Sequence, residues 1–306
     1  MKIFLQKANE NWICDRFVEE WEQNNPQYCT EHIHAADVIW LLAGWAWNHI
    51  PPQYLQAKKV VTTIHHIDPT KFDEPAYANF MMRDSITDFY HVPCEKTKQQ
   101  IQALTKKKIF VQPFWVNQNI WKEIPDKLNL RSELGLPVDK FFVGSFQRDT
   151  EGHDLKSPKL SKGPDVFCDI IESMYEENNN VEVILAGWRR QYVINRLNEK
   201  NINFHYFEWA DFELLNKLYN CLDLYLVSSR CEGGPQSIVE CAISKTPIVS
   251  TDVGLASDIL AKESLYEIGN DIGIPNVDIA HQRIQDYLIP SGFNNFIKFF
   301  EICHEG

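Results

Sequence analysis

The sequence predicts an α/β protein built from two doubly wound parallel sheets. Its 306 residues exceed one ordinary hydrophobic core and suit two domains. Short apolar runs alternate with longer stretches of helical periodicity in both halves, a pattern typical of parallel sheets covered by helices. A polar stretch with two prolines, residues 119–140, separates the two halves.

The expected strands are apolar runs that end in glycine, histidine or a polar loop, as buried parallel strands do. In the first half they are 2–6, 37–44, 58–66, 85–92 and 107–113; in the second half they are 141–146, 181–187, 202–207, 222–227, 246–250 and 264–268. Helical patterns fill the gaps. We expect domains at 1–126 and 127–290, with a C-terminal helix, 291–306, packing back towards the N-terminal domain.

Composition excludes several classes of protein. The net charge of −12 argues against nucleic-acid binding, which normally needs a basic surface. The eight cysteines form no C-x-x-C pair and are expected to be reduced. The apolar stretch at the start of the sequence is too short for a signal peptide, and no run reaches the roughly 20 apolar residues of a membrane span. A cytoplasmic location is expected, with peripheral contact at the inner face of a membrane left open.

The segment 228–254 places a glycine-rich turn before a helix. Gly233 and Gly234 allow a ligand to approach the backbone closely. The amides of Gln236, Ser237 and Ile238 would open the helix and attract an anion, most simply a phosphate. The alternative is an ordinary strand-turn-helix connection, in which Gly-Gly-Pro is only turn chemistry.

Two carboxylates flank this turn in an apolar neighbourhood. Glu240 follows Gln236 by one helical turn and has apolar neighbours, so it needs a partner. The hydroxyls of a ribose would serve, and so would a lysine or backbone amides of the protein. Glu232 precedes the two glycines.

Basic residues and histidines follow other expected strands. Arg148 and Lys162 lie after the 141–146 run, where a guanidinium and an ammonium suit a diphosphate, although loop lysines are usually only solvated. His65 and His66 end the 58–66 run and could contact a hydroxyl or move a proton. No motif supports a metal site. Trp45 and Trp47 follow another strand, where stacking on a sugar, contact with a membrane and core packing all remain open.

These residues resemble a known family. "QRD…SKGPD" and "SSRCEGGPQSIVECAISKTPIVSTDVG", in which seven residues separate Glu232 from Glu240, are similar to the GT-B-fold retaining glycosyltransferases of family 4, the group 1 glycosyl transferases. The resemblance is strongest over 131–260. It implies two Rossmann-like domains facing across a cleft. Gln147 stands where the family usually has glycine, and the first strand lacks the family's glycine-rich turn.

The resemblance also implies roles for the candidate residues. Arg148 and Lys162 would hold the donor diphosphate without a metal, and Glu232 would face the transferred sugar. His65 would contact that sugar or the acceptor. The remaining binding residues would be Gly233, Gly234, Gln236, Ser237 and Ile238 at the phosphate and sugar, and Glu240 at the ribose.

The function expected from this resemblance is metal-independent transfer of a hexose, with retention, from a nucleotide-diphosphate sugar (UDP or GDP) to an acceptor hydroxyl. The acceptor would be a glycan, a lipid-linked group or another hydroxyl compound, in glycan or glycolipid biosynthesis. No cofactor is expected. The alternatives are a nucleotide-sugar epimerase or phosphorylase on the same fold, and a non-catalytic nucleotide-sugar-binding partner of another transferase.

Overall fold

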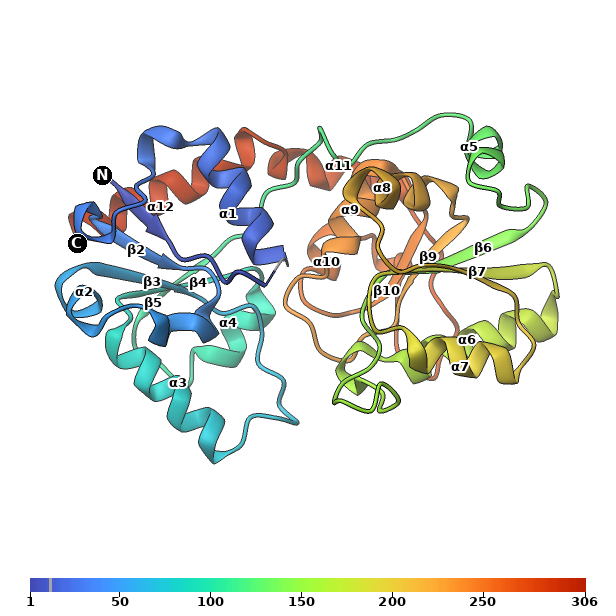
Figure 1. Ribbon diagram of the computed structural model, residues 1–306, viewed down its shortest axis with the longest axis horizontal. Coiled ribbons are helices and arrows are strands. Elements are labelled where there is room, and N and C mark those ends of the chain that lie inside the picture. The colour runs from blue at the N-terminus through green and yellow to red at the C-terminus, as the bar shows by residue number, and fades with distance from the viewer. Residues whose placement is uncertain (11–12) are drawn as a thin grey trace. The chain divides into compact units, whose positions relative to one another are not determined.

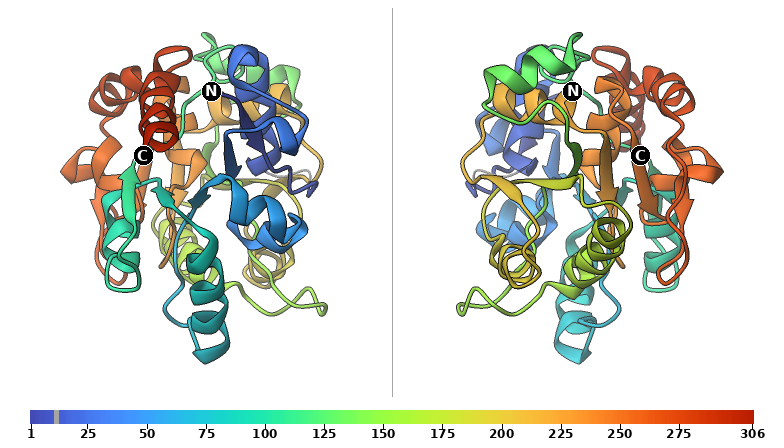
Figure 2. Two further views of the ribbon diagram at one scale, coloured as in Figure 1. Left: turned by 90° about the vertical axis from the view of Figure 1, so that its left-hand side faces the viewer. Right: turned by 90° about the vertical axis from the view of Figure 1, so that its right-hand side faces the viewer.

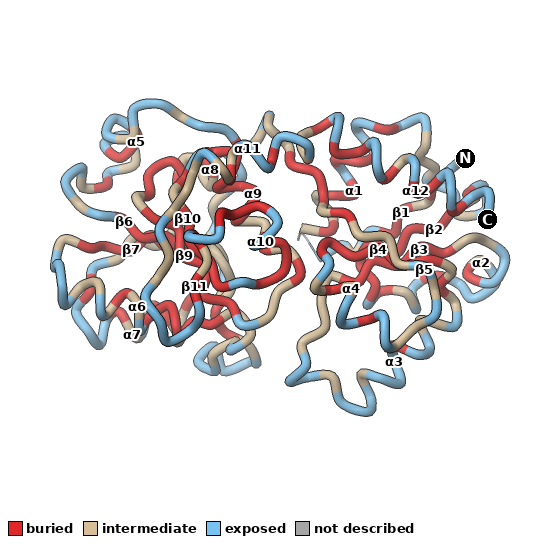
Figure 3. Tube along the Cα trace, turned by 180° about the vertical axis from the view of Figure 1, so that it is seen from behind, coloured by how far each residue is buried: buried red, intermediate tan, exposed pale blue. Residues whose placement is uncertain are grey.

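The computed structural model describes residues 1–10 and 13–306, which fold into two compact units. Unit 1 comprises 1–115 and 289–306, and unit 2 comprises 116–288 (Figure 1). Each unit is built on its own parallel sheet, and the strands form the buried centre of each (Figure 3). The predicted fold class of two parallel-sheet domains is confirmed.

The sheet of unit 1 has the strand order β1-β2-β3-β4-β5. Its strands are β1 (Ile3–Leu5), β2 (Val38–Leu41), β3 (Lys59–Thr63), β4 (Phe89–Val92) and β5 (Lys108–Val111). Helices α1 (Ile13–Asn24) and α12 (Asn294–Glu305) cover one face, and α2 (Pro52–Ala57), α3 (Glu74–Ile86) and α4 (Glu95–Ile101) cover the other (Figures 1 and 2). The strands of this sheet are mostly apolar, as expected for a parallel sheet covered on both faces.

A single-residue bridge explains how helices reach both faces of this sheet. Ile3 pairs with Val38 on one side and with Cys29 on the other, and Cys29 is an isolated parallel bridge. After α1 the chain therefore reaches the free edge of β1, and then crosses through a short 3-10 helix, Ile33–Ala35, to β2 on the opposite side. Ile33 packs in the cluster on the α2 face. The chain thus moves outward from β1 to Cys29 and then back past β1 to β2. A single bridge stands where a full outer strand would pair with β1.

The sheet of unit 2 has the order β11-β10-β9-β6-β7-β8. The strands are β6 (Phe141–Ser145), β7 (Val181–Ala186), β8 (Phe204–Phe207), β9 (Leu224–Val227), β10 (Ile248–Thr251) and β11 (Leu265–Tyr266). The helices are α5 (Lys127–Glu133), α6 (Pro164–Glu177), α7 (Gln191–Glu199), α8 (Phe212–Cys221), α9 (Gln236–Ser244), α10 (Ala256–Ile259) and α11 (Val277–Ile284). The order reverses between β6 and β9. Ligands of such sheets bind at the carboxyl ends of the strands at this point.

The boundary between the units lies earlier than the predicted residue 126. Residues 116–126 belong to unit 2 because their contacts are there. Val116 bridges Leu288, and the amide of Lys122 donates to Asn216 Oδ1 at 3.1 Å. The polar, proline-containing composition marks a loop, but the backbone hydrogen bonds of that loop decide which unit it joins.

The C-terminal segment 289–306 packs within unit 1. Phe296 and Phe300 of α12 enter the same cluster as Trp21 and Trp40, with ring centroids 5.6 Å apart for Trp21 and Phe300. No helix among the described residues is long and apolar enough to cross a membrane. All eight cysteines are free thiols.

Candidate functional site

The candidate site of unit 2 lies where β6 and β9 are neighbours, since Val143 pairs with Leu224 in the register of the two strands. The loops that follow these strands are joined by hydrogen bonds. Ser228 Oγ donates to the carbonyl of Gly163 at 2.8 Å, and the amide of Arg230 donates to the carbonyl of Ser161 at 2.8 Å. Segments that are far apart in sequence therefore form one platform.

Two glycines make this close approach possible. Gly163 has a φ of +61°, and a Cβ there would lie 1.8 Å from the carbonyl oxygen of Ser228. Gly254 has a φ of +51°, and a Cβ there would lie 2.3 Å from the carbonyl oxygen of Gly233. Only glycine satisfies both the left-handed backbone and the contact. Gly163 thereby fixes Lys162, and Gly254 supports the loop of Gly233 and Gly234.

Lys162 and Glu232 form an ion pair across this platform, between Lys162 Nζ and Glu232 Oε1. The hydroxyl of Ser229 also donates to Glu232 Oε1, at 3.4 Å. A second ion pair braces the same loops, because Arg230 binds Asp165 through two contacts of 2.7 and 2.6 Å. The Arg230 guanidinium lowers the pKa of Asp165.

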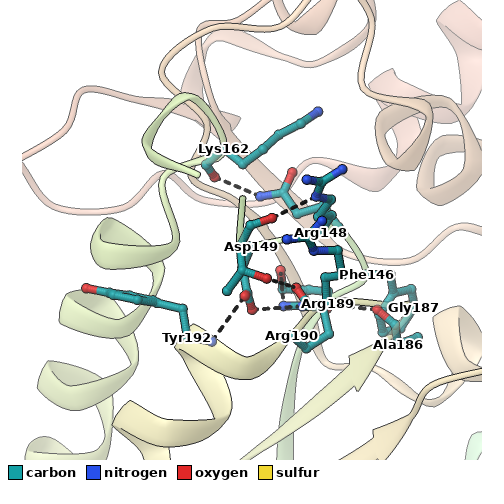
Figure 4. Close-up of polar contacts among 12 residues, drawn as sticks. Phe146, Arg148, Asp149, Lys162, Ala186, Gly187, Arg189, Arg190 and Tyr192 are labelled. Atoms are coloured by element: carbon teal, nitrogen blue, oxygen red, sulfur yellow. Dashed lines mark hydrogen bonds and ion pairs between the residues drawn. The ribbon is translucent and has the colours of Figure 1, made fainter. Parts of the chain in front are cut away.

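Arg148 follows β6, and its Nε donates to the carbonyl of Thr150 at 2.7 Å. Figure 4 shows the side chains of Arg148 and Lys162 extending on the same side of the strand end. Partial burial lowers the pKa of Arg148, and the nearby Arg189 lowers it further. The structure therefore places two of the predicted phosphate-binding cations at one strand end.

Asp149 and Arg190 form a buried pair beneath these cations. Arg190 is fully buried, and its Nε donates to Asp149 Oδ2 at 3.0 Å. Its Nη1 donates to the carbonyls of Ala186, at 3.0 Å, and Ser145. Burial raises the pKa of Asp149, and Arg190 opposes this shift. This pair ties the end of β6 to the end of β7 and holds the backbone that carries Arg148.

Helix α9 begins at Gln236, with Pro235 at its N-cap. The amides of Gln236 and Ser237 belong to its first turn, where the helix itself supplies no acceptor. The amide of Ile238 donates to the carbonyl of Pro235 at 3.0 Å, and the Ile238 side chain is fully buried. The Ile238 amide is therefore bonded within the turn that opens α9, whereas the amides of Gln236 and Ser237 lie at the start of the helix.

Glu240 is 4% exposed and accepts a hydrogen bond of 2.8 Å from the hydroxyl of Tyr219. Burial raises the pKa of Tyr219 well above its usual value, and the negative charge of Glu240 raises it further. A tyrosine is thus one partner of this buried carboxylate, where the sequence suggested a ribose, a lysine or backbone amides.

His65 lies in unit 1, directly after β3, and His66 follows it half-buried. His65 Nε2 is 3.0 Å from the carbonyl of Leu42 and 3.6 Å from Cys14 Sγ. A carbonyl only accepts, so Nε2 carries the proton and Nδ1 is the acceptor of a neutral ring. Burial lowers the pKa of His65 to about 4, which keeps the ring neutral at pH 7.

The structure separates the two tryptophans that the sequence left open. Trp47 packs against the cluster that contains Ile39 and Leu41. Trp45 is 49% exposed, and its Nε1 donates to Glu10 Oε1 at 3.1 Å. Its ring centroid lies 5.9 Å from that of His65, so Trp45 borders the same strand ends.

Sequence reasoning missed Arg189, which lies in the turn after β7 beside Arg148. It also missed two exposed aromatic residues, Trp188 after β7 and Trp209 after β8. The rule that selected Arg148, namely position just after a buried strand, applies equally to these three residues. Among the described residues there is no cluster of three or more histidine, cysteine, aspartate or glutamate side chains that could hold a metal ion.

Comparison with known proteins is consistent with this geometry. Residues 155–280 match the sequence profile of the family described as "Glycosyl transferases group 1". This segment includes Lys162, Glu232 and Glu240 and begins after Arg148. A glycogen synthase from Thermosipho melanesiensis is 26% identical over an alignment of 187 residues that covers 57% of this chain and 35% of that protein. The chain thus spans about a third of the length of this relative.

Two solved structures share the fold over most of the chain. Sucrose-phosphate synthase from Thermosynechococcus elongatus is 15% identical with a TM-score of 0.69, covering 95% of this chain and 77% of that one. Anabaena HepE in complex with UDP and glucose is 14% identical with a TM-score of 0.66, covering 93% and 89%.

The fold shared with these structures is the GT-B fold, which confirms the predicted fold. The resemblance to the group 1 glycosyl transferases is likewise confirmed, over residues 155–280.

Proposed function

We propose that this chain is a metal-independent, retaining glycosyltransferase that moves a hexose from a nucleotide-diphosphate sugar to an acceptor hydroxyl. The observation that carries the proposal is the Lys162–Glu232 pair, which two obligatory glycines hold at the switch point of a parallel sheet. The acceptor would be a glycan, a lipid-linked group or another hydroxyl compound in glycan or glycolipid biosynthesis.

In this mechanism the leaving diphosphate develops negative charge, and the cations stabilise it. Lys162 exchanges its contact with Glu232 for a phosphate oxygen, while Arg148 and the first turn of α9 bind the same group. Fixed donors of this kind supply a large part of enzymatic rate enhancement because they need no reorganisation during the reaction. Released from Lys162, Glu232 accepts hydrogen bonds from the transferred sugar.

Retention would follow from attack on the face that the leaving group departs from, with the departing phosphate accepting the proton of the acceptor hydroxyl. The C1–O bond to phosphate breaks as the new C1–O bond forms. Glu240, oriented by Tyr219, would bind the ribose hydroxyls of the donor.

His65 would act in this reaction as a neutral acceptor. Because Leu42 fixes the proton on Nε2, Nδ1 can accept a hydrogen bond from a hydroxyl of the sugar or of the acceptor. Burial raises the pKa of the adjacent Cys14 to about 12, so Cys14 does not serve as a thiolate nucleophile.

A ligand screen followed by a turnover assay tests the function. UDP, GDP and their hexose conjugates are compared by thermal shift, starting with UDP-glucose because HepE has been solved with it. We expect one nucleotide series to raise Tm and its sugar conjugate to be consumed when an acceptor is added. Glu232→Gln should retain the nucleotide-induced rise in Tm and lose transfer by about 10²-fold or more. Wild-type turnover by this variant would contradict the assignment.

The single-bridge edge of unit 1 favours a second candidate, a non-catalytic nucleotide-sugar-binding partner of another transferase. A reduced unit 1 could support donor binding in unit 2 without an acceptor site. Tight donor binding without turnover across a panel of saccharide and lipid-linked acceptors would favour this function. Consumption of donor without acceptor would instead indicate the epimerase or phosphorylase alternative.

A further inference from the structure

Arg189 lies in the turn between β7 and α7 and has no role in the mechanism described above. It has a φ of +64°, in the left-handed region that glycine adopts without steric cost and arginine does not. The preceding Gly187 has a φ of +88°, so the chain already uses glycine in the same turn. An arginine retained in such a backbone suggests that its side chain has a role.

The turn is held firmly against the loop that follows β6. The carbonyl of Arg189 accepts hydrogen bonds from the amide of Asp149, at 3.1 Å, and from the hydroxyl of Thr150, at 3.2 Å. Arg189 Nη2 donates to the carbonyl of Gly152, while Arg148 Nε donates to the carbonyl of Thr150. Both guanidinium groups are therefore fixed on carbonyls of one short segment, 150–152.

Neither guanidinium forms an ion pair with a carboxylate of the described residues, in contrast to Arg190, which pairs with Asp149. Arg189 Nε is buried and has no hydrogen-bond partner within the described part of the chain. Burial has the largest effect on the pKa of Arg148. Among the neighbouring charges, Arg189 lowers this pKa more than Glu151 raises it. The two guanidinium groups are therefore close enough to repel each other, and Glu151 offsets this repulsion only in part.

We propose that Arg189 is a second guanidinium ligand of the donor diphosphate, acting with Arg148 at the ends of β7 and β6. The planar fork of each arginine can donate two parallel hydrogen bonds to a phosphate in a fixed geometry, which the point-like ammonium of a lysine does not offer. The inference rests on the proposed donor-binding function and adds a residue to it. If Arg189 only anchored the loop through Gly152, ligand affinity would not depend on the fork geometry of its guanidinium.

Calorimetric titration of Arg189→Gly with UDP or GDP, whichever stabilises the wild type, tests the inference. Glycine relieves the backbone and removes the guanidinium. We expect an unchanged or higher Tm, about tenfold weaker binding of the diphosphate and of pyrophosphate, and unchanged binding of the matching nucleoside. Lys156→Gln is the control, because it removes an exposed positive charge from the same loop.

A second variant, Arg189→Lys, covers the case in which Arg189→Gly is destabilised. Lysine keeps the charge and can still reach the Gly152 carbonyl, so a loop anchor would retain full diphosphate affinity, whereas a fork ligand would lose several-fold. Unchanged affinity in both variants, with a loss in Arg148→Gln, would overturn the inference and leave the proposed function intact. A wild type that binds no nucleoside diphosphate and no pyrophosphate would overturn both.

Discussion

The carboxyl ends of the strands differ in chemistry between the two units. In unit 2 they carry charged groups. Lys162 forms an ion pair with Glu232, and Arg190 forms one with Asp149. The cations Arg148 and Arg189 lie beside each other. In unit 1 the corresponding ends carry two groups that burial keeps neutral, alongside the charged Glu10 that accepts a hydrogen bond from Trp45. His65 and Cys14 are held uncharged at pH 7 by burial.

Under the proposed function, this difference corresponds to a division of labour between the two units. Unit 2 is suited to a doubly charged ligand, because backbone carbonyls hold Arg148 and Arg189, and Glu232 holds Lys162, before any ligand arrives. Unit 1 is suited to a group that offers hydroxyls, since a neutral imidazole and an exposed tryptophan contact such groups without paying for a buried charge. The predictions below would each break or sharpen this contrast.

The largest effect is expected from Lys162→Ala in unit 2. It removes one preorganised charge from the leaving diphosphate, and we expect kcat/KM to fall by about 10³-fold, or about 4 kcal/mol. Lys156→Ala, an exposed lysine of the neighbouring loop, should leave kcat/KM nearly unchanged. Similar small losses of kcat/KM in both variants would contradict the proposal that the cations of unit 2 stabilise the leaving diphosphate.

The next effect concerns the glycine that holds Lys162 in place. Gly163→Ala places a Cβ 1.8 Å from the Ser228 carbonyl in a left-handed backbone, so we expect the free energy of unfolding to fall by about 3 kcal/mol or more. Gly135→Ala is the matched control. It has a φ of +67° but nothing within 4 Å of the added Cβ, so only about 1 kcal/mol should be lost. Equal losses in denaturant titrations would show that the Ser228 contact is unimportant.

The smallest effect is a pH dependence located in unit 1. Burial lowers the pKa of His65 to about 4 and that of the fully buried His91 to about 3, below the ordinary value near 6.5. The unfolded chain therefore binds more protons than the folded chain as the pH falls below about 6.5. Stability is fully present above that value, and is lost on acidification by about 1.4 kcal/mol per pH unit for each histidine.

Denaturant titrations between pH 7 and 5 measure this slope. His91→Asn should make it shallower by about one histidine's share, while His205→Asn, at the edge of the unit 2 sheet, serves as the comparison. An unchanged slope in His91→Asn would mean that this ring does not govern the acid sensitivity of unit 1.

Much of the fold could be predicted from local sequence. The buried strands are short apolar runs, and the alternation with helices leaves few topologies open. The first crossover could not be predicted, because the bridge at Cys29 involves one residue and has no periodicity. The domain boundary was misplaced for a related reason: Val116 and Lys122 look like linker residues, and only their partners in unit 2 assign them.

The sequence by itself determined the two parallel sheets, the positions of Arg148, Lys162 and Glu232 near strand and helix ends, and that of Glu240 one turn into α9. Apolar periodicity and turn residues act over a few neighbouring positions, which is why the sequence reveals them. The tertiary structure alone decided the partners: Lys162 with Glu232, Glu240 with Tyr219, and Arg189 beside Arg148. These contacts join residues separated by 70, 21 and about 40 positions, and burial and close packing of the folded chain are what bring such residues together.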